Sequence, residues 1–174
     1  LMRLFADTVR RHAPALGERV KASCGAATFS WYIGIGEGLG ASPDGRKAGE
    51  PVASNLSPSL GRDLEGIPAA IASHAALPHG LFPEGGPLDL RLARGLVAGQ
   101  AGTARMAALV RAFVELGGSM MTLTVTDAEE LREAQREPEK HRNLRVRMGG
   151  WSAYFTMLSR EQQNHHIRRQ EGRS

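Results

Sequence analysis

The chain of 174 residues is long enough to bury one ordinary hydrophobic core, so it could form about one domain. A single cysteine excludes a framework of disulfides, and no apolar run of about eighteen residues is present that could span a membrane. The net charge of +4 would suit an anionic partner. The arginines are dispersed, however, and aromatic residues make up only 5% of the chain, so we expect no nucleic-acid surface.

An amphipathic helix and a long loop-rich segment are expected first. Residues 4–16 mix apolar and basic side chains at helical spacing, which predicts a helix that ends near Pro14 or Gly17. From residue 34 to residue 99, glycine, proline and serine separate short apolar runs, and such long loops usually line a functional site. The glycine run at 34–40 is no dinucleotide-binding loop, because Leu39 stands where the third glycine is needed.

Helices and strands alternate in the second half. Apolar residues over 106–116 recur every three or four positions before two glycines, which predicts a helix. β-Branched residues predict a strand over 120–125. A short helix to about Arg136 follows, and Asp127 with Glu130 has the spacing of a capping box at its start.

The last segment predicts a short strand at 145–148 that leads into a loop, and then a final helix. Ser159 and Gln162 have the spacing of another capping box. We expect this helix to run to about Arg169.

His141, His165 and His166 could suggest a metal site. Adjacent helical residues point about 100° apart, and no cysteine or carboxylate completes a tetrahedral set. We therefore expect no metal, and a solvent-facing position for the two adjacent histidines. The sequence also lacks the G-x-S-x-G elbow of a hydrolase.

Several segments resemble, in the same order, motifs of the glycyl radical enzymes. Residues 147–155 read R-M-G-G-W-S-A-Y-F and are similar to the radical-bearing loop of that family, with Met148 in place of valine. Residues 41–51 read A-S-P-D-G-R-K-A-G-E-P, and residues 56–63 continue this motif. Residues 131–144 resemble the approach to the radical loop. P-D-G alone marks only a turn, but the ordered set identifies the chain as a member of the family.

The resemblance implies that the backbone Cα–H of Gly150 is the functional group and is oxidised to a stored glycyl radical. Glycine suits this role because an α-carbon without a Cβ can flatten to a planar radical. Gly149 is the alternative, but Gly150 directly precedes the aromatic residue, as in the family. The residues expected to support the loop are Arg147, Gly149, Trp151, Ser152, Tyr154 and Phe155.

Two kinds of support are expected within this loop. Arg147 should fix it through charge-assisted hydrogen bonds to backbone carbonyls or to a carboxylate. The rings of Trp151, Tyr154 and Phe155 should pack over the loop and exclude water rather than relay electrons.

The P-D-G-R turn is a second candidate site. Asp44, Gly45 and Arg46 would form either a partner surface beneath the active-site cavity of the family or a structural turn closed by an ion pair. The sequence does not separate these alternatives.

The fold class implied by the resemblance is α/β: the C-terminal portion of a glycyl radical enzyme-type α/β barrel, with the radical loop between a strand and a C-terminal helix. Residues 1–50 would be the end of the pyruvate formate-lyase-like catalytic barrel domain, and residues 51–174 the glycine radical domain. The residues alone predict only a mixed α/β segment with a loop between strand and helix.

The family installs its radical through a separate activating enzyme that uses S-adenosylmethionine and an iron–sulfur cluster, so no cofactor is expected on this chain. The radical then passes to a cysteine. Cys24 lacks the G-C-x-E setting of the family and is expected to be a small buried thiol, so the thiyl cysteine should lie in the rest of the catalytic chain. The full enzyme is expected to be a homodimer in an anoxic, reducing cytoplasm.

The reaction subclass is open. Residues 149–155 resemble lyases that act on diols, amines or aryl acetates more than formate acetyltransferases, which suggests an arylacetate-decarboxylase-like or dehydratase-type lyase that cleaves C–C or C–X bonds. The alternatives are a formate C-acetyltransferase, a stand-alone radical-domain subunit, or a non-catalytic interaction domain.

Overall fold

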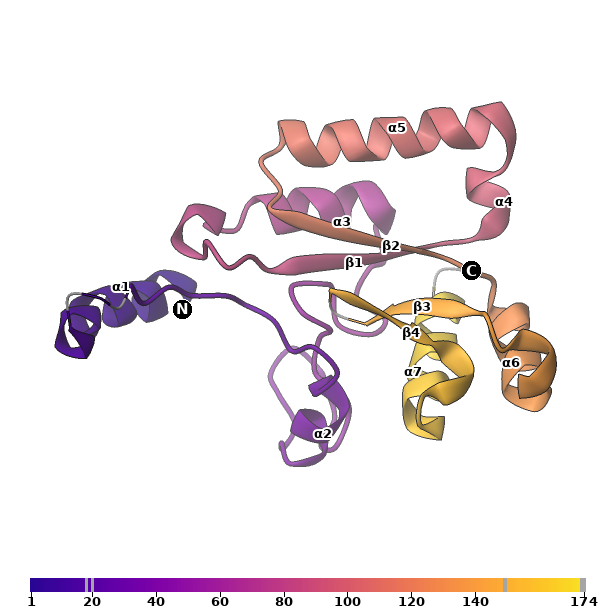
Figure 1. Cartoon of the computed structure of the whole chain (residues 1–174), viewed down its shortest axis with the longest axis horizontal. Helices are drawn as coiled ribbons and strands as arrows, with labels where there is room; N and C mark the ends of the chain where they lie inside the picture. The colour runs from indigo at the N-terminus through magenta and orange to yellow at the C-terminus, as the bar shows by residue number, and fades with distance from the viewer. Residues whose placement is uncertain (18, 20, 149, 173–174) are drawn as a thin grey trace.

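The computed structural model describes residues 1–17, 19, 21–148 and 150–172. Two pairs of strands lie at its centre, with helices on either side (Figure 1). The upper layer in that view consists of α3 (Gly66–Ala75), β1 (Pro87–Leu92), α5 (Gly99–Glu115) and β2 (Met120–Val125). The lower layer consists of α6 (Ala128–Arg136), β3 (Arg145–Met148), β4 (Trp151–Tyr154) and α7 (Arg160–Glu171).

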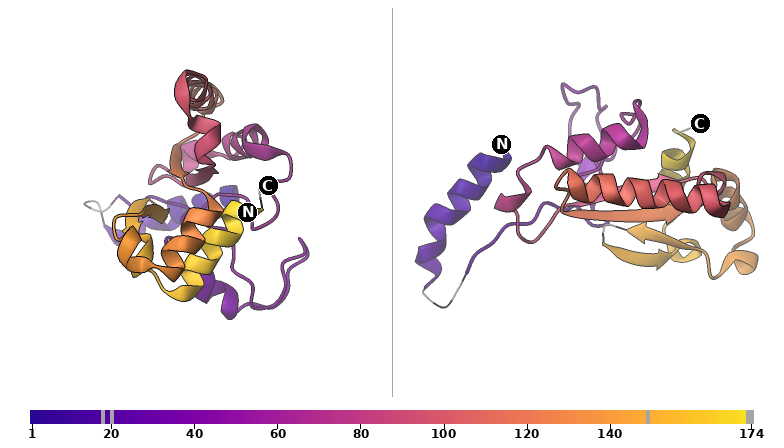
Figure 2. Two further views of the ribbon diagram at one scale, coloured as in Figure 1. Left: turned by 90° about the vertical axis from the view of Figure 1, so that its right-hand side faces the viewer. Right: turned by 90° about the horizontal axis from the view of Figure 1, so that it is seen from above.

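Shorter elements connect or flank these layers. Helix α1 (Met2–His12) continues into the 3-10 turn η1 (Ala13–Leu16) and lies at one end of the molecule (Figure 2). The remaining elements are α2 (Tyr32–Glu37), η2 (His79–Leu81), α4 (Arg94–Val97), η3 (Pro138–His141) and η4 (Phe155–Met157).

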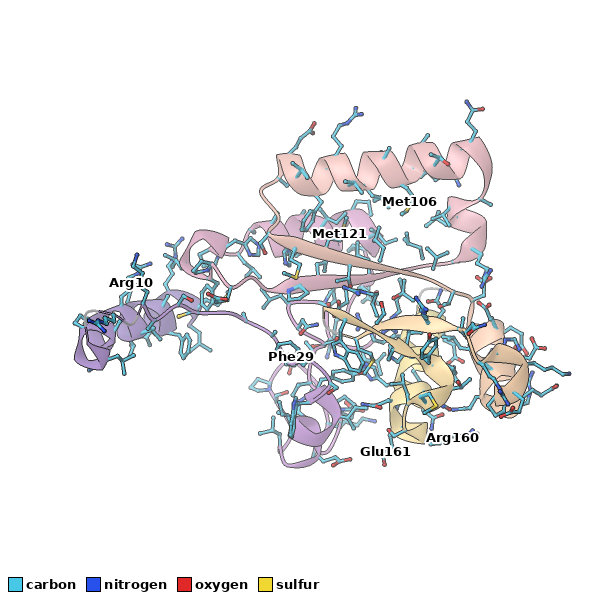
Figure 3. All side chains as sticks on the ribbon, in the orientation of Figure 1. Arg10, Phe29, Met106, Met121, Arg160 and Glu161 are labelled. Carbon is cyan, nitrogen blue, oxygen red and sulfur yellow. The ribbon has the colours of Figure 1, made fainter. Side chains whose placement is uncertain are left out.

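The upper layer forms because β1 and β2 pair in parallel around the intervening helix α5. Leu88 and Leu90 of β1 are fully buried and pack with Ile71 of α3 and Phe113 of α5. Met121 of β2 packs against the same cluster, between the strands and the helices (Figure 3). Parallel strands need a crossover of this length, and burial of both strand faces is their usual state.

The lower layer has its own apolar core. Leu131 and Ala134 of α6, Val146 of β3, Phe155 of η4 and Ile167 of α7 form one buried cluster. Helices α6 and α7 therefore lie side by side under the β3–β4 hairpin.

A buried polar network fills the space on the other face of β1. The Asp89 carboxylate accepts hydrogen bonds from Ser54 Oγ at 3.0 Å, Asn55 Nδ2 at 2.6 Å and Thr122 Oγ1 at 2.5 Å. Ser57 Oγ accepts from the Asp89 backbone N–H at 2.9 Å. A buried carboxylate requires such a set of donors, and the network ties residues 54–57 to both central strands.

A third, smaller cluster attaches α1 to the body. Ala6, Cys24 and Phe82 are buried together, and Phe5 stacks on Phe82 with ring centroids 6.4 Å apart. Cys24 is thus a free, buried thiol, as the sequence indicated.

Several expected elements are confirmed, among them the opening helix, α5, β2, α6 and β3. The capping box of α7 is also present, with Ser159 Oγ accepting from the Gln162 backbone N–H and the Gln162 side chain accepting from the Ser159 N–H. The α/β fold class is confirmed by this mixture of elements, whereas the chain itself does not close a barrel within the described residues.

The segment from 34 to 99 is rich in loops, as expected, although it also contains α3, α4, the buried strand β1 and most of α2. One expectation about elements is wrong. Asp127 precedes α6 but makes no side-chain cap. Its Oδ1 instead accepts from the Arg94 backbone N–H at 3.1 Å, and Glu130 binds the Arg94 guanidinium.

Candidate functional site

Gly150 lies in the turn of the β3–β4 hairpin. The register pairs Met148 with Trp151, so only residues 149 and 150 connect the two strands. Gly150 has φ +105°, and nothing lies within 4 Å of an ideal Cβ built on it. The position is therefore open, yet its backbone conformation is one that only glycine adopts readily. Gly149, the alternative radical position, lies outside the described residues.

Arg147 closes this turn. Its Nη2 donates to the Gly150 carbonyl at 2.9 Å, and its Nη1 donates to Ser152 Oγ at 3.0 Å. The Arg147 backbone N–H donates to Thr124 Oγ1 of β2 at 3.2 Å, which links the hairpin to the upper layer. The guanidinium thus binds a backbone carbonyl, as the sequence predicted, and uses Ser152 from the opposite strand.

The aromatic residues of the loop do not share one role. Phe155 is fully buried in the lower core, which agrees with a packing role. Trp151 and Tyr154 are 47% and 41% exposed within this chain, so the described residues do not bury them, and their role in covering the loop stays a prediction. Strand β4 lies at the surface and buries only Ala153, and the Tyr154 hydroxyl accepts from Arg145 at 3.1 Å.

The two adjacent histidines of α7 are buried, so the expected solvent-facing position is wrong. His165 and His166 are 2% and 1% exposed, although their helix has little apolar periodicity. The His165 ring packs on Tyr32 of α2 at 4.6 Å between centroids, and His166 Nε2 lies 2.9 Å from Met148 Sδ. Helix α7 is covered on these sides by α2, β1 and the hairpin, which removes water from both rings.

Burial leaves both imidazoles neutral. Desolvation, with smaller contributions from Arg169, Arg91 and Arg168, lowers the pKa of His165 to about 2. Desolvation, followed by Arg91, His165 and Arg169, lowers the pKa of His166 well below its usual range. Within the described part of the chain, no cluster of three or more histidine, cysteine, aspartate or glutamate side chains could hold a metal ion.

A pocket of about 430 Å³ lies beside Gly150. Its wall includes Gly25, Phe29, Gly85 and Met120 from three other segments. Phe29 is a non-glycine residue at φ +47°, and the Asn55 side chain holds it there by accepting from its backbone N–H at 3.2 Å. Backbone strain of this kind persists where the surrounding structure fixes it, often at functional sites.

The P-D-G-R turn forms a separate structural unit. Gly45 has φ +92°, and the Asp44 carboxylate accepts from Ser42 Oγ at 2.6 Å, which lowers its pKa. Arg46 donates to the carbonyls of Gly40, Lys47 and Glu50, so it closes its own loop rather than pairing with Asp44. The adjoining pocket of about 130 Å³ is bounded by Arg168 of α7 and not by the hairpin.

The sequence did not indicate Thr124, His166 or Phe29 as parts of this site. Thr124 and His166 reach the hairpin from β2 and α7, and only the packing of the two layers brings them there. The only signal for His166 in the sequence was the pair of adjacent histidines in a helix capped by Ser159. The polarity of that pair favoured a solvent-exposed position. Phe29 carried no signal, because its conformation depends on Asn55.

No helix among the described residues is both long and apolar enough to cross a membrane.

Comparison with known proteins agrees with the geometry. A family model described as glycine radical matches residues 52–156. The chain is 39% identical over 140 residues to trans-4-hydroxy-L-proline dehydratase of Clostridioides difficile, covering 80% of this chain and 18% of that protein. It is 34% identical over 143 residues to isethionate sulfite-lyase of Bilophila wadsworthia, covering 81% of this chain and 17% of that protein.

A solved structure of a glycyl radical enzyme from Archaeoglobus fulgidus superposes with a TM-score of 0.89 and 39% identity. The match covers 97% of this chain and 21% of that one, so the chain spans about a fifth of the length of the proteins it resembles. The family model includes the hairpin and the turn at Gly150. The chain is therefore a member of the glycyl radical enzyme family and corresponds to its C-terminal part.

Proposed function

We propose that Gly150 stores a backbone radical and that this chain is the radical-storing part of a glycyl radical lyase. One observation carries the proposal: the glycine that fits the family motif has an open Cα at φ +105°, in a turn held by Arg147. In the proposed cycle, a separate activating enzyme uses S-adenosylmethionine and an iron–sulfur cluster to remove a hydrogen atom from this Cα. The chain itself contributes the glycine and the turn that presents it.

The second half of the cycle requires a thiol from outside this chain. The Gly150 radical takes the hydrogen atom of a cysteine S–H, which restores the Cα–H bond and leaves a thiyl radical to attack the substrate. Cys24 is not proposed for this step, because it is packed with Ala6 and Phe82 under α1. The pocket beside Gly150 provides space for such a reacting loop to approach.

For the reaction itself, we propose a dehydratase-type cleavage of a C–X bond. The identity of 39% to a hydroxyproline dehydratase supports this class over the sulfite-lyase, at 34%. An arylacetate-decarboxylase-like lyase is the next candidate, and formate C-acetyltransferase chemistry is the alternative.

The assignment of residues 51–174 to the radical domain is supported by a family match that begins at residue 52. Residues 1–50 are assigned to the end of the barrel domain.

We further propose that the activating enzyme and the cysteine-bearing part of the catalytic chain are the partners of this protein. The complete enzyme is proposed to be a cytoplasmic homodimer.

Electron paramagnetic resonance tests the radical. The chain is incubated without oxygen with an activating enzyme of the family, S-adenosylmethionine and a reductant. We expect a glycine-type signal whose α-hydrogen splitting collapses when the protein is labelled with α-deuterated glycine. Gly150→Ala should give no such signal.

Gly117→Ala is the matched control, because Gly117 also has positive φ (+85°) and open space at its Cβ position but lies after α5. It should keep the signal. A signal that survives in Gly150→Ala would assign the radical to another residue. No signal from folded wild-type chain, with an activase that activates another family member, would instead support a non-catalytic interaction domain.

A further inference from the structure

A histidine of α7 contacts the last residue of β3, immediately before the glycine turn. His166 Nε2 lies 2.9 Å from Met148 Sδ, and both side chains are 1% exposed. A thioether sulfur has no hydrogen to donate, so the contact requires a proton on His166 Nε2, which one of the two neutral tautomers carries. A neutral imidazole is also the form that burial favours here, since the pKa of His166 is far below its usual range.

The groups that face His166 come from three directions. Arg91 of β1 donates to the His166 backbone carbonyl at 3.3 Å. Phe155 of η4 contacts the imidazole edge-on, with centroids 6.4 Å apart, and His165 and Arg169 neighbour it on α7. The charged groups among them are cations, so none would stabilise a protonated His166 in the closed structure.

Met148 connects this contact to the radical position. Met148 pairs with Trp151 in the last residue pair before the turn, and it precedes Gly150 by two residues. The hairpin also contributes residues to the apolar core. Among the described residues, it has one polar attachment to the upper layer, from the Arg147 backbone to Thr124, and one to α7, from Met148 to His166. The second attachment is the one nearest to the turn in sequence.

We infer that His166 is a positioning residue for Gly150: by donating to Met148 it holds the β3–β4 hairpin on α7 and so sets how often the glycine turn leaves the body of the protein. The inference rests on the proposed function, in which Gly150 must meet both an activating enzyme and a cysteine. Opening of the hairpin exposes the imidazole to water, where its pKa returns to about 6.5. Opening is therefore favoured as pH falls below about 6.5, and is independent of this group above that pH.

Hydrogen exchange of the hairpin amides, measured on the full chain without any activating enzyme, tests this inference. His166→Leu removes the donor, and Met148→Leu removes the acceptor with little change in volume. We expect the amide hydrogens of Val146 and Ala153 to exchange about two- to five-fold faster in each variant than in the wild type, with rates taken relative to amides of β1 and β2. The double variant should match the single variants, because both remove the same contact.

His165→Leu is the matched control. It removes an equally buried imidazole from the adjacent position, but one that faces Tyr32 instead of the hairpin. Its relative hairpin exchange should equal that of the wild type. The inference is overturned if His165→Leu has the same effect as His166→Leu, if the single effects multiply in the double variant, or if Met148→Leu leaves exchange unchanged.

A pH series separates positioning from simple space filling. In the wild type, after correction for intrinsic exchange, the opening equilibrium of the hairpin should rise toward tenfold for each pH unit below about 6.5. His166→Gln keeps an N–H donor without the titration, so it should retain protection and lose the pH dependence. A wild-type series that is flat between pH 7 and 5 would contradict the inference. Failure of the radical proposal would leave these results unchanged, since the measurement needs no radical.

Discussion

At the scale of single residues, the cost of a buried polar group is clearest at His165. Neither ring nitrogen has a hydrogen-bond partner among the described residues, although the ring is 2% exposed. A buried donor or acceptor left without a partner costs about 1–3 kcal/mol. His166, one residue later, directs its ring to a sulfur instead. The two histidines are adjacent in the sequence, but the fold places their side chains in different surroundings.

His165→Leu should therefore stabilise the protein. The substitution removes the unsatisfied ring nitrogens and keeps an apolar side chain against Tyr32. We expect the free energy of unfolding at pH 7 to increase by about 1 kcal/mol, measured by urea denaturation monitored by circular dichroism. A decrease would mean that the ring makes polar contacts that outweigh its desolvation. His79→Leu, at a partly buried ring that binds the His74 carbonyl, should by contrast lower stability.

At the scale of elements, helix ends illustrate what a local motif can predict. The spacing of Ser159 and Gln162 predicted a capping box that the structure contains. Asp127 and Glu130 have the same spacing, yet both side chains bind Arg94, the first residue of α4. A side-chain cap can be predicted from sequence only when no residue from a distant part of the chain competes for the same oxygen atoms.

Ser159→Ala should weaken α7. The substitution leaves the Gln162 N–H without its acceptor, and we expect the free energy of unfolding to fall by about 1 kcal/mol. Ser159→Asp keeps an acceptor and should stay close to the wild type in the same denaturation experiment. An equal loss in both variants would show that the hydroxyl acts through something other than the cap.

Strands were predicted less completely than helices. Strand β2 has a run of β-branched residues and was expected, whereas β1 alternates leucine with Asp89 and Arg91 and was not. That alternation would suit a strand with one face in water. Here the polar face is also buried, because Asp89 has donors on residues 54–57 and Arg91 reaches α7. Strand β4 was missed for another reason: the family motif suggested an open loop across residues that in fact pair with β3.

At the scale of the whole molecule, the two layers are joined mainly by polar contacts rather than by one continuous apolar core. Arg169 of α7 donates to the Asp89 carbonyl at 3.2 Å, and Arg91 of β1 donates to the His166 carbonyl. The apolar clusters of the two layers have no residue in common. The motifs predicted the family and the position of the glycine turn, but these cross-layer contacts depend on tertiary packing and could not be predicted.

Global stability should depend on pH through the histidines between the layers. The folded-state pKa values of His165 and His166 lie far below their value of about 6.5 in the unfolded chain, so the unfolded state binds more protons as pH falls. We expect the free energy of unfolding to be constant above about pH 7 and to fall by about 2 kcal/mol between pH 6 and pH 5.

The double variant His165→Leu/His166→Leu should lose most of this dependence in the same pH series. A decrease that persists unchanged in the double variant would assign the effect to other groups. The lowered pKa values of Asp44, Glu129 and Glu137 cannot account for it, because carboxylates with depressed pKa values titrate below pH 5.

The short connection between β3 and β4 also bears on the order of folding. A hairpin closed by two residues forms on a timescale of about microseconds, whereas β1 and β2 must first bring together segments on either side of α5. Pairing across so short a loop costs far less chain entropy than pairing across a helix. The hairpin turn that holds Gly150 can therefore form early and locally, before β1 pairs with β2, the strand to which the Arg147 backbone attaches.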